Sequence, residues 1–220
     1  MKTLNLSRLL AAFLLIFALS AVTVTPASAT LLSEGAAVDP ADGNGMFAIG
    51  TLVTTMTSSF SNPLFSGILD TNVYDTGSGM LDFWYRLSND IGSANAITRL
   101  TVGGFAPFTT DVYDRTDNGG GTQRVSNLAD RSSGILGFGY GSTTADKLNP
   151  GETGAWVVVR TDARAYRSTT GFVIDGEIDM ASTITADVVP EPGTYALMGL
   201  GLVVFALLSK RRRFALARKR

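Results

Sequence analysis

Apolar and polar side chains alternate with a period of two residues along the middle of the chain, and this alternation restricts the fold more than any other feature. Between Leu81 and Ser88 every second residue is Leu, Phe or Tyr, and the run from Phe172 to Met180 alternates similarly. Successive side chains of a β-strand point to opposite faces, so each run predicts a strand with one apolar face. No apolar pattern with a 3.6-residue period reaches helix length here, so we expect an all-β fold.

Turn-forming residues separate the alternating runs. Asn149-Pro150-Gly151-Glu152 suits a type II turn, and Asp175-Gly176 permits either a continuous strand or a two-residue hairpin turn. We expect a single antiparallel β-sandwich, Ig-like or jelly-roll-like, over residues 46–189, after a flexible leading segment at residues 30–45. The candidate strands are 46–56, 65–74, 81–88, 97–105, 109–113, 135–140, 155–161, 172–180 and 183–188.

The chain contains neither His nor Cys. The missing residues exclude a Ser-His-Asp triad, a thiolate nucleophile, zinc-thiolate sites and disulfides. Carboxylates, Lys and Tyr remain, which suit glycoside hydrolysis or the binding of a hard cation. We find no catalytic constellation, so we expect no enzymatic activity and no cofactor.

Positive charge is concentrated at the two ends of the chain. Between Thr30 and Val189 there are nine basic and eighteen acidic residues, a net charge of −9. A body with this charge is poorly suited to nucleic acid or anionic lipid, so we expect no nucleic-acid partner.

The first 29 residues have the pattern of a signal peptide. Lys2 and Arg8 precede a 14-residue apolar run from Leu9 to Val22, shorter than the roughly 20 residues of a spanning helix. Ala27 and Ala29 then supply the small side chains that signal peptidase requires. We expect a signal helix that signal peptidase removes after Ala29, rather than an uncleaved anchor, and a body that folds outside the cytoplasm.

Three elements follow one another at the C-terminus. Pro190, Glu191 and Pro192 form an extended acidic motif, because proline lacks an amide donor and disfavours helix before it. The apolar stretch 195–208 is 14 residues long, which predicts a short, marginal transmembrane helix. The positive-inside rule places the basic stop in the cytoplasm and the body across the membrane. The basic stop consists of Lys210, Arg211, Arg212 and Arg213.

This order resembles the PEP-CTERM sorting signal of Gram-negative bacteria, which an exosortase recognises. Pro190, Glu191 and Pro192 match the recognition motif, 195–208 the helix and 210–213 the basic stop, so the signal covers residues 190–213. Residues 214–220 form a longer cytoplasmic extension than expected. The resemblance implies export, transient anchoring in the inner membrane, removal of the tail, and delivery to the cell surface or an exopolysaccharide matrix. The pattern of the body resembles that of other proteins with this tail, which generally have no assigned activity.

Both tryptophans fall on the strand faces opposite the apolar ones. Trp84 shares its side with Arg86, and Trp156 shares its side with Arg160. Flat rings beside charged groups suit a glycan-stacking surface. The alternative, which we favour, is that the rings pack under loops or stack on arginine.

Two clusters of oxygen-bearing side chains are weak candidates for calcium. Neither has the spacing of an EF-hand or a calcium β-roll, so we favour solvated turn residues and expect no metal. The clusters are Asp111, Asp114 and Asp117 before a triple glycine, and Asp39, Asp42 and Asn44 near the start of the body.

These features together predict a non-enzymatic protein of the cell surface or extracellular matrix, associated with exopolysaccharide or biofilm. Its expected partners are signal peptidase, exosortase and, transiently, the inner membrane, with exopolysaccharide as a further candidate. Two alternatives remain open: a carbohydrate-binding module that uses an exposed tryptophan face, and a carboxylate-based glycoside hydrolase.

Overall fold

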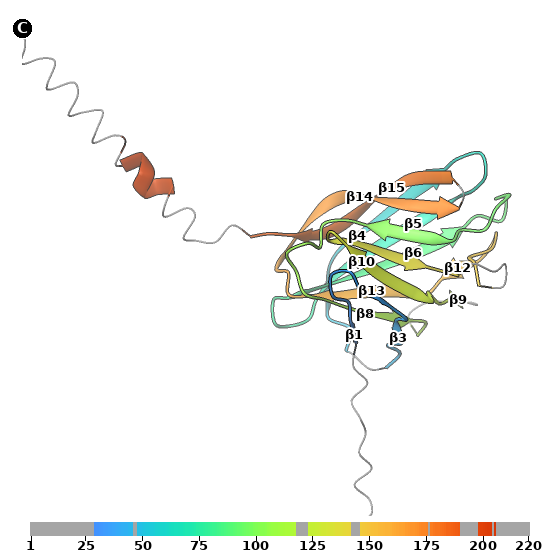
Figure 1. The fold of residues 1–220 in the computed structure, drawn as a ribbon, viewed down its shortest axis with the longest axis horizontal. Helices are drawn as coiled ribbons and strands as arrows, with labels where there is room; N and C mark the ends of the chain where they lie inside the picture. The colour runs from blue at the N-terminus through green and yellow to red at the C-terminus, as the bar shows by residue number, and fades with distance from the viewer. Residues whose placement is uncertain are drawn as a thin grey trace, which may run out of the picture.

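The computed structural model describes residues 29–45, 48–117, 123–141, 146–175, 177–189, 198–203 and 205. Two β-sheets pack face to face, and the chain leaves them at the end of β15 toward the C-terminal tail (Figure 1). The predicted all-β sandwich is therefore confirmed.

The first sheet contains nine of the described strands. Its central series, β4-β5-β6-β13-β8, is antiparallel throughout, and only the short pairs β3–β8 and β9–β12 are parallel. The strands are β1 (Thr30–Leu31), β3 (Ala41–Asp42), β4 (Thr51–Ser61), β5 (Ser66–Asp75), β6 (Leu81–Asn89), β8 (Thr110–Arg115), β9 (Gln123–Arg124), β12 (Thr153–Gly154) and β13 (Trp156–Thr161).

The second sheet has six described strands in the order β15-β14-β7-β11-β10-β2, and all its pairs are antiparallel. Of the two interpretations of Asp175-Gly176, the continuous strand is wrong, because β14 ends at Asp175 and β15, which starts at Glu177, runs antiparallel to it. The strands are β2 (Ala37–Val38), β7 (Arg99–Val102), β10 (Leu128–Ser132), β11 (Ile135–Gly139), β14 (Ala165–Asp175) and β15 (Glu177–Asp187).

The core fills the space between the two sheets. Phe83, Tyr85 and Leu87, the apolar face of β6, are fully buried there. Two hydrogen bonds join the sheets through this core: the hydroxyls of Thr71 and Thr183 lie 2.7 Å apart, and the Tyr85 hydroxyl donates to the Ile184 carbonyl at 2.7 Å. Buried polar groups therefore fix how one sheet sits on the other.

The β14–β15 hairpin reverses the expected orientation of its apolar residues. Phe172, Ile178 and Met180 are exposed, whereas Val173, from the opposite face, is fully buried. Alternation over 172–180 predicts that the larger apolar residues share one face of the strand. It does not predict that this face is exposed and that the smaller Val173 and Ala181 are buried in the core. The outer surface of the second sheet is consequently apolar near the hairpin turn.

The segment at 30–45, which we expected to be a flexible approach to the domain, is instead built into the sandwich. Its strand β1 pairs with β8 of the first sheet, and β2 pairs with β10 of the second. Leu32 is fully buried between them. Small and polar composition suggested a loose segment, but one buried leucine and its backbone pairing are enough to order it.

Arg131 holds this crossing segment from inside the structure. Its guanidinium donates to the Leu32 carbonyl at 3.3 Å, the Thr110 hydroxyl at 2.8 Å, and the carbonyls of Phe105 and Phe108, each at 2.9 Å. One buried cation thus hydrogen-bonds backbone acceptors from two separate segments, together with the hydroxyl of Thr110.

The predicted signal peptide lies outside the described residues apart from Ala29. In the tail, residues 198–203 and 205 are helical and exposed wherever described. Among the described residues no helix is both long and apolar enough to span a membrane.

Candidate functional site

The two tryptophans lie together on the outer face of the first sheet. β6 and β13 are neighbours in register, with Trp84 opposite Val158, and this brings the two ring centroids to 6.0 Å in an edge-on arrangement. Tyr74, Tyr113 and Val158 complete a second hydrophobic cluster around the rings.

Arginine side chains lie over these rings. The Arg86 guanidinium is 4.4 Å from the centroid of the Trp156 ring, and that of Arg115 is 5.2 Å from the Trp84 ring. Arg86 also pairs with Asp70 at 3.0 Å. Arg86 therefore makes a cation–π contact with a tryptophan ring and an ion pair with a carboxylate at the same time.

The hypothesis of an exposed tryptophan platform is wrong, and the favoured alternative, in which the rings stack on arginine, is confirmed. Trp84 is only 1% exposed and Trp156 only 4%. Arg160, the other proposed sugar ligand, forms an ion pair with Asp82 at 3.0 Å and lies over Tyr113. Alternation placed the rings on the outer face correctly, but a residue on the outer face of a sheet is not necessarily accessible.

The three aspartates proposed as a calcium site do not come together. Asp111 and Asp114 point to opposite faces of β8, and Asp117 pairs with Arg115 at 2.6 Å. The Arg115 guanidinium, with which Asp117 hydrogen-bonds, holds the pKa of Asp117 below its usual range. Among the described residues no group of three or more acidic side chains is arranged to hold a metal ion.

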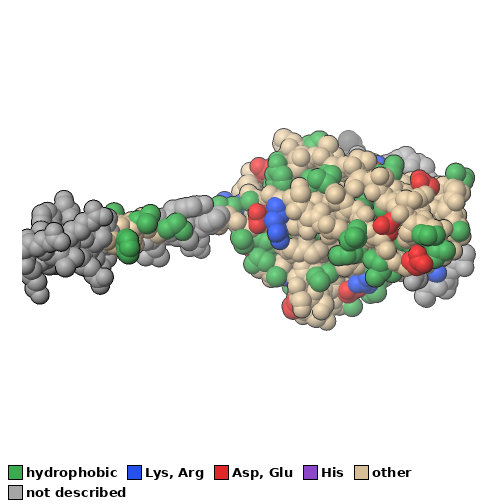
Figure 2. Space-filling model, turned by 90° about the horizontal axis from the view of Figure 1, so that it is seen from above, with side chains coloured by type: hydrophobic (Ala, Val, Ile, Leu, Met, Phe, Trp, Pro, Cys, Tyr) green, Lys and Arg blue, Asp and Glu red, His purple; other side chains and the backbone are tan. Residues whose placement is uncertain are grey.

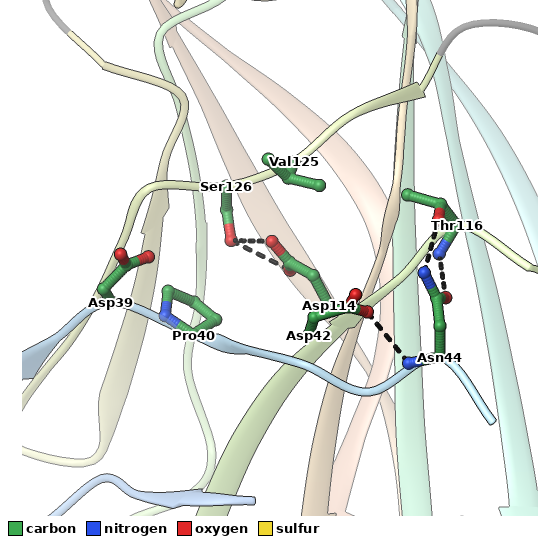
Figure 3. A pocket seen from close by; sticks show the side chains of 8 residues that line it. All are labelled: Asp39, Pro40, Asp42, Asn44, Asp114, Thr116, Val125 and Ser126. Carbon is green, nitrogen blue, oxygen red and sulfur yellow. Dashed lines mark hydrogen bonds between the residues drawn. The ribbon is translucent and has the colours of Figure 1, made fainter. Parts of the chain in front are cut away.

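Asp114 instead meets the other acidic cluster across a hollow of about 310 Å³ (Figure 3). Asp39 and Asp42 line this hollow from the segment around β3, and Ser126 lines it from the segment between β9 and β10. The parallel pairing of β3 with β8 produces this meeting, because it places Asp42 opposite Asp114.

Hydrogen bonds order the walls of the hollow. Asn44 accepts from the Thr116 amide at 2.7 Å and donates to the Thr116 hydroxyl at 2.6 Å, while Asp42 accepts from the Asn44 amide at 2.9 Å (Figure 3). The Ser126 hydroxyl lies 2.9 Å from both carboxylate oxygens of Asp114.

Asp114 is the most strongly perturbed carboxyl that lines the hollow. Burial raises its pKa to about 8; the hydrogen bonds from Ser126 oppose that shift, and the charges of Asp39 and Asp42 add to it. At neutral pH this carboxyl is therefore largely protonated. A neutral acid beside two other carboxyls has the composition of a general acid site, but Asp114 is only 4% exposed.

Sequence reasoning identified Asp39, Asp42 and Asp114 but assigned them to two separate loops. It missed Ser126, which follows Asp114 by twelve residues and belongs to no recognisable motif. Only the long-range pairing of β3 with β8 brings these groups together.

The sorting residues lie almost entirely outside the described residues. This applies to Ala27, to Pro190, Glu191 and Pro192, and to the basic stop 210–213. Ala29 is described: it is partly buried and packs against the tryptophan cluster. The described part of the sandwich continues to Asp187, immediately before the motif.

Comparison with known families supports the predicted sorting signal in the tail. Residues 188–213 match the model of the PEP-CTERM protein-sorting motif, which confirms the resemblance in sequence. Comparison with curated proteins and with solved structures gave no match. The motif implies export, C-terminal membrane anchoring before cleavage, and processing by an exosortase, and so an exosortase-targeted surface protein.

Proposed function

We propose that the chain is a non-enzymatic component of the cell surface or extracellular matrix. The sandwich is the part that is delivered there, and the C-terminal motif directs its delivery. The single observation that carries this proposal is the match of residues 188–213 to the PEP-CTERM motif, directly after the last strand. Association with exopolysaccharide is the specific role that we assign to the released sandwich.

The composition of the body supports a non-enzymatic role. No His or Cys is available as a base or nucleophile. The buried rings of Trp84 and Trp156 remove the feature that favoured a carbohydrate-binding module. Contact with polysaccharide would therefore depend on other surfaces of the sandwich.

A carboxylate-based hydrolase is the second candidate, and the raised pKa of Asp114 is the one observation in its favour. Asp114→Asn and Asp42→Asn test it directly. If purified protein releases reducing sugar from the exopolysaccharide of the parent strain, and either substitution abolishes that release, the non-enzymatic proposal is wrong.

Intact mass and cell fractionation test the delivery itself, in the parent strain and in a strain without exosortase. We expect a mature species that begins at Thr30 and ends between Pro190 and Gly193 in the parent, recovered from the surface or matrix fraction. In the mutant the tail should be retained in the inner membrane. A full-length C-terminus in the membranes of both strains would refute exosortase processing.

A further inference from the structure

Five strands of the sandwich begin or end where the tail leaves it. Asp75 at the end of β5 pairs with Thr51 at the start of β4 and with Leu81 at the start of β6. The Leu81 amide donates to the Ala163 carbonyl just before β14, and Ala165 of β14 pairs with Asp187 at the end of β15. We call this part of the molecule the tail-side end (Figure 1).

Large apolar side chains are exposed on the tail-side end. Leu52 is 51% exposed and Tyr166 is 42% exposed. Figure 2 shows hydrophobic side chains near the point where the tail leaves the body, with acidic and basic groups among them. The full set consists of Ile49, Leu52, Val53, Tyr166, Val188 and Val189.

The length of chain between sandwich and tail limits how far this end can lie from a membrane. Only residues 190–194 separate Val189 from the apolar stretch that starts at Tyr195. Five fully extended residues span at most about 18 Å. A headgroup layer is roughly 5 to 7 Å thick on each side of the hydrocarbon core, so an anchored tail holds the tail-side end at or near the lipid surface.

We propose that the tail-side end is a membrane-docking surface, which rests in the headgroup region of the outer leaflet of the inner membrane while the chain is anchored. The proposal rests on the proposed function, because it requires an anchored intermediate before cleavage. Docking would hold the motif at residues 190–192 close to the membrane surface, where a membrane enzyme can reach it.

The contact is apolar rather than electrostatic. Arg167 lies 3.7 Å from Asp187, and Arg164 and Asp75 also belong to this end, so basic and acidic groups are mixed. The body has a net charge of −9, which gives no attraction to anionic lipid. Leucine, valine and tyrosine are the side chains expected to enter an interface on apolar grounds.

Single-cysteine labelling can test this surface, because the natural chain has no Cys and a single introduced Cys is the only labelling site. Three full-length variants, Leu52→Cys, Ile178→Cys and Leu202→Cys, carry an NBD fluorophore. Each is reconstituted in vesicles of phosphatidylethanolamine and phosphatidylglycerol, without nitroxide or with a lipid that bears a nitroxide, placed near the headgroup for positions 52 and 178 and deep in the acyl chain for position 202, which lies seven residues inside the apolar stretch.

Ile178 is the matched control. It is exposed and apolar like Leu52, but it lies at the start of β15, nine residues from Asp187 and thus roughly 30 Å from the tail-side end. Leu202, in the helical part of the tail, reports whether the tail has entered the bilayer.

We expect the nitroxide to quench emission about twofold or more at positions 52 and 202, to leave position 178 almost unchanged, and to act equally at low and high salt. Quenching at 202 without quenching at 52 overturns the docking surface and leaves the anchored intermediate intact. Equal quenching at 52 and 178 overturns it as well. No quenching at 202 refutes the anchoring on which both proposals depend.

Discussion

Asp114 should make the stability of the sandwich fall as the pH rises, and Asp114→Asn should remove this effect. Asparagine has nearly the same shape and keeps a carbonyl oxygen that can accept from the Ser126 hydroxyl. It cannot ionise, so the variant avoids the cost of a buried charge. The substitution thus isolates the titration of one group.

The sign and size of this pH effect follow from the linkage between proton binding and folding. Burial raises the pKa of Asp114 from 3.8 to about 8. Between these values the folded state holds a proton that the unfolded state has lost, so stability is fully present below about pH 4 and is lost as the pH rises toward 8. One pH unit corresponds to about 1.4 kcal/mol, and about three units lie between the unfolded pKa and pH 7. We expect Asp114→Asn to stabilise the domain by on the order of 4 kcal/mol at pH 7 and very little at pH 4.

Urea unfolding of the sandwich, residues 30–189, measures this difference between pH 4.5 and 8.5. The buried Trp84 and Trp156 supply the fluorescence signal. The difference between variant and wild type should grow with pH and level off near pH 8. Two curves that stay parallel over this range would refute the argument, because other titrating groups are common to both proteins.

Asp117→Asn is the control of opposite sign. Arg115 lowers the pKa of Asp117, so the ionised carboxylate stabilises the folded state above its unfolded pKa. The variant should be less stable than wild type at neutral pH, and the difference should vanish as the pH falls through the acid range.

Three further predictions concern the rest of the domain. Arg131→Met should lower the free energy of unfolding by about 3 kcal/mol or more, because it removes the guanidinium donor of the Ala106 and Phe108 carbonyls and one of the two donors to the Leu32 carbonyl, and urea unfolding with intact far-UV circular dichroism checks it. Trp84→Ala should lower the free energy of unfolding by about 3 to 5 kcal/mol. At a temperature where the variant is folded, its polysaccharide binding should equal that of wild type, and a selective loss of binding would support the glycan-stacking surface. Millimolar calcium should not raise the melting temperature, and a calcium-dependent rise that Asp114→Asn abolishes would contradict the separation of the acidic groups.

The sequence predicts those parts of the fold that depend on local patterns. Alternation over 81–88 predicts β6 to within one residue of its observed end at Asn89, because the alternation is strict and the apolar residues are large. The run 46–56 was placed too early, since β4 is Thr51–Ser61 and its threonines and serines give little contrast between faces. β10 was missed altogether, because Leu128–Ser132 contains two charged residues in five positions.

The candidate site was predicted less completely because it depends on contacts between distant segments. Asp42 and Asp114 are 72 positions apart, and only the β3–β8 pairing joins them. The burial of Trp84 depends likewise on how neighbouring strands supply Arg115 and Tyr74 around the ring. Spacing along one strand gives the face on which a side chain lies, but not what covers it.

The continuation of β15 to Asp187 also determines how the protein bears mechanical load. While the uncleaved tail anchors the chain, a pull on the body is transmitted through this strand, since only a few residues follow it before the motif. Tension along the strand acts in shear on the eleven residue pairs between β14 and β15, from Ala165–Asp187 to Asp175–Glu177. These pairs must yield together rather than one at a time. The C-terminal strand is therefore oriented to resist extraction from the sheet while force is applied to the attachment point.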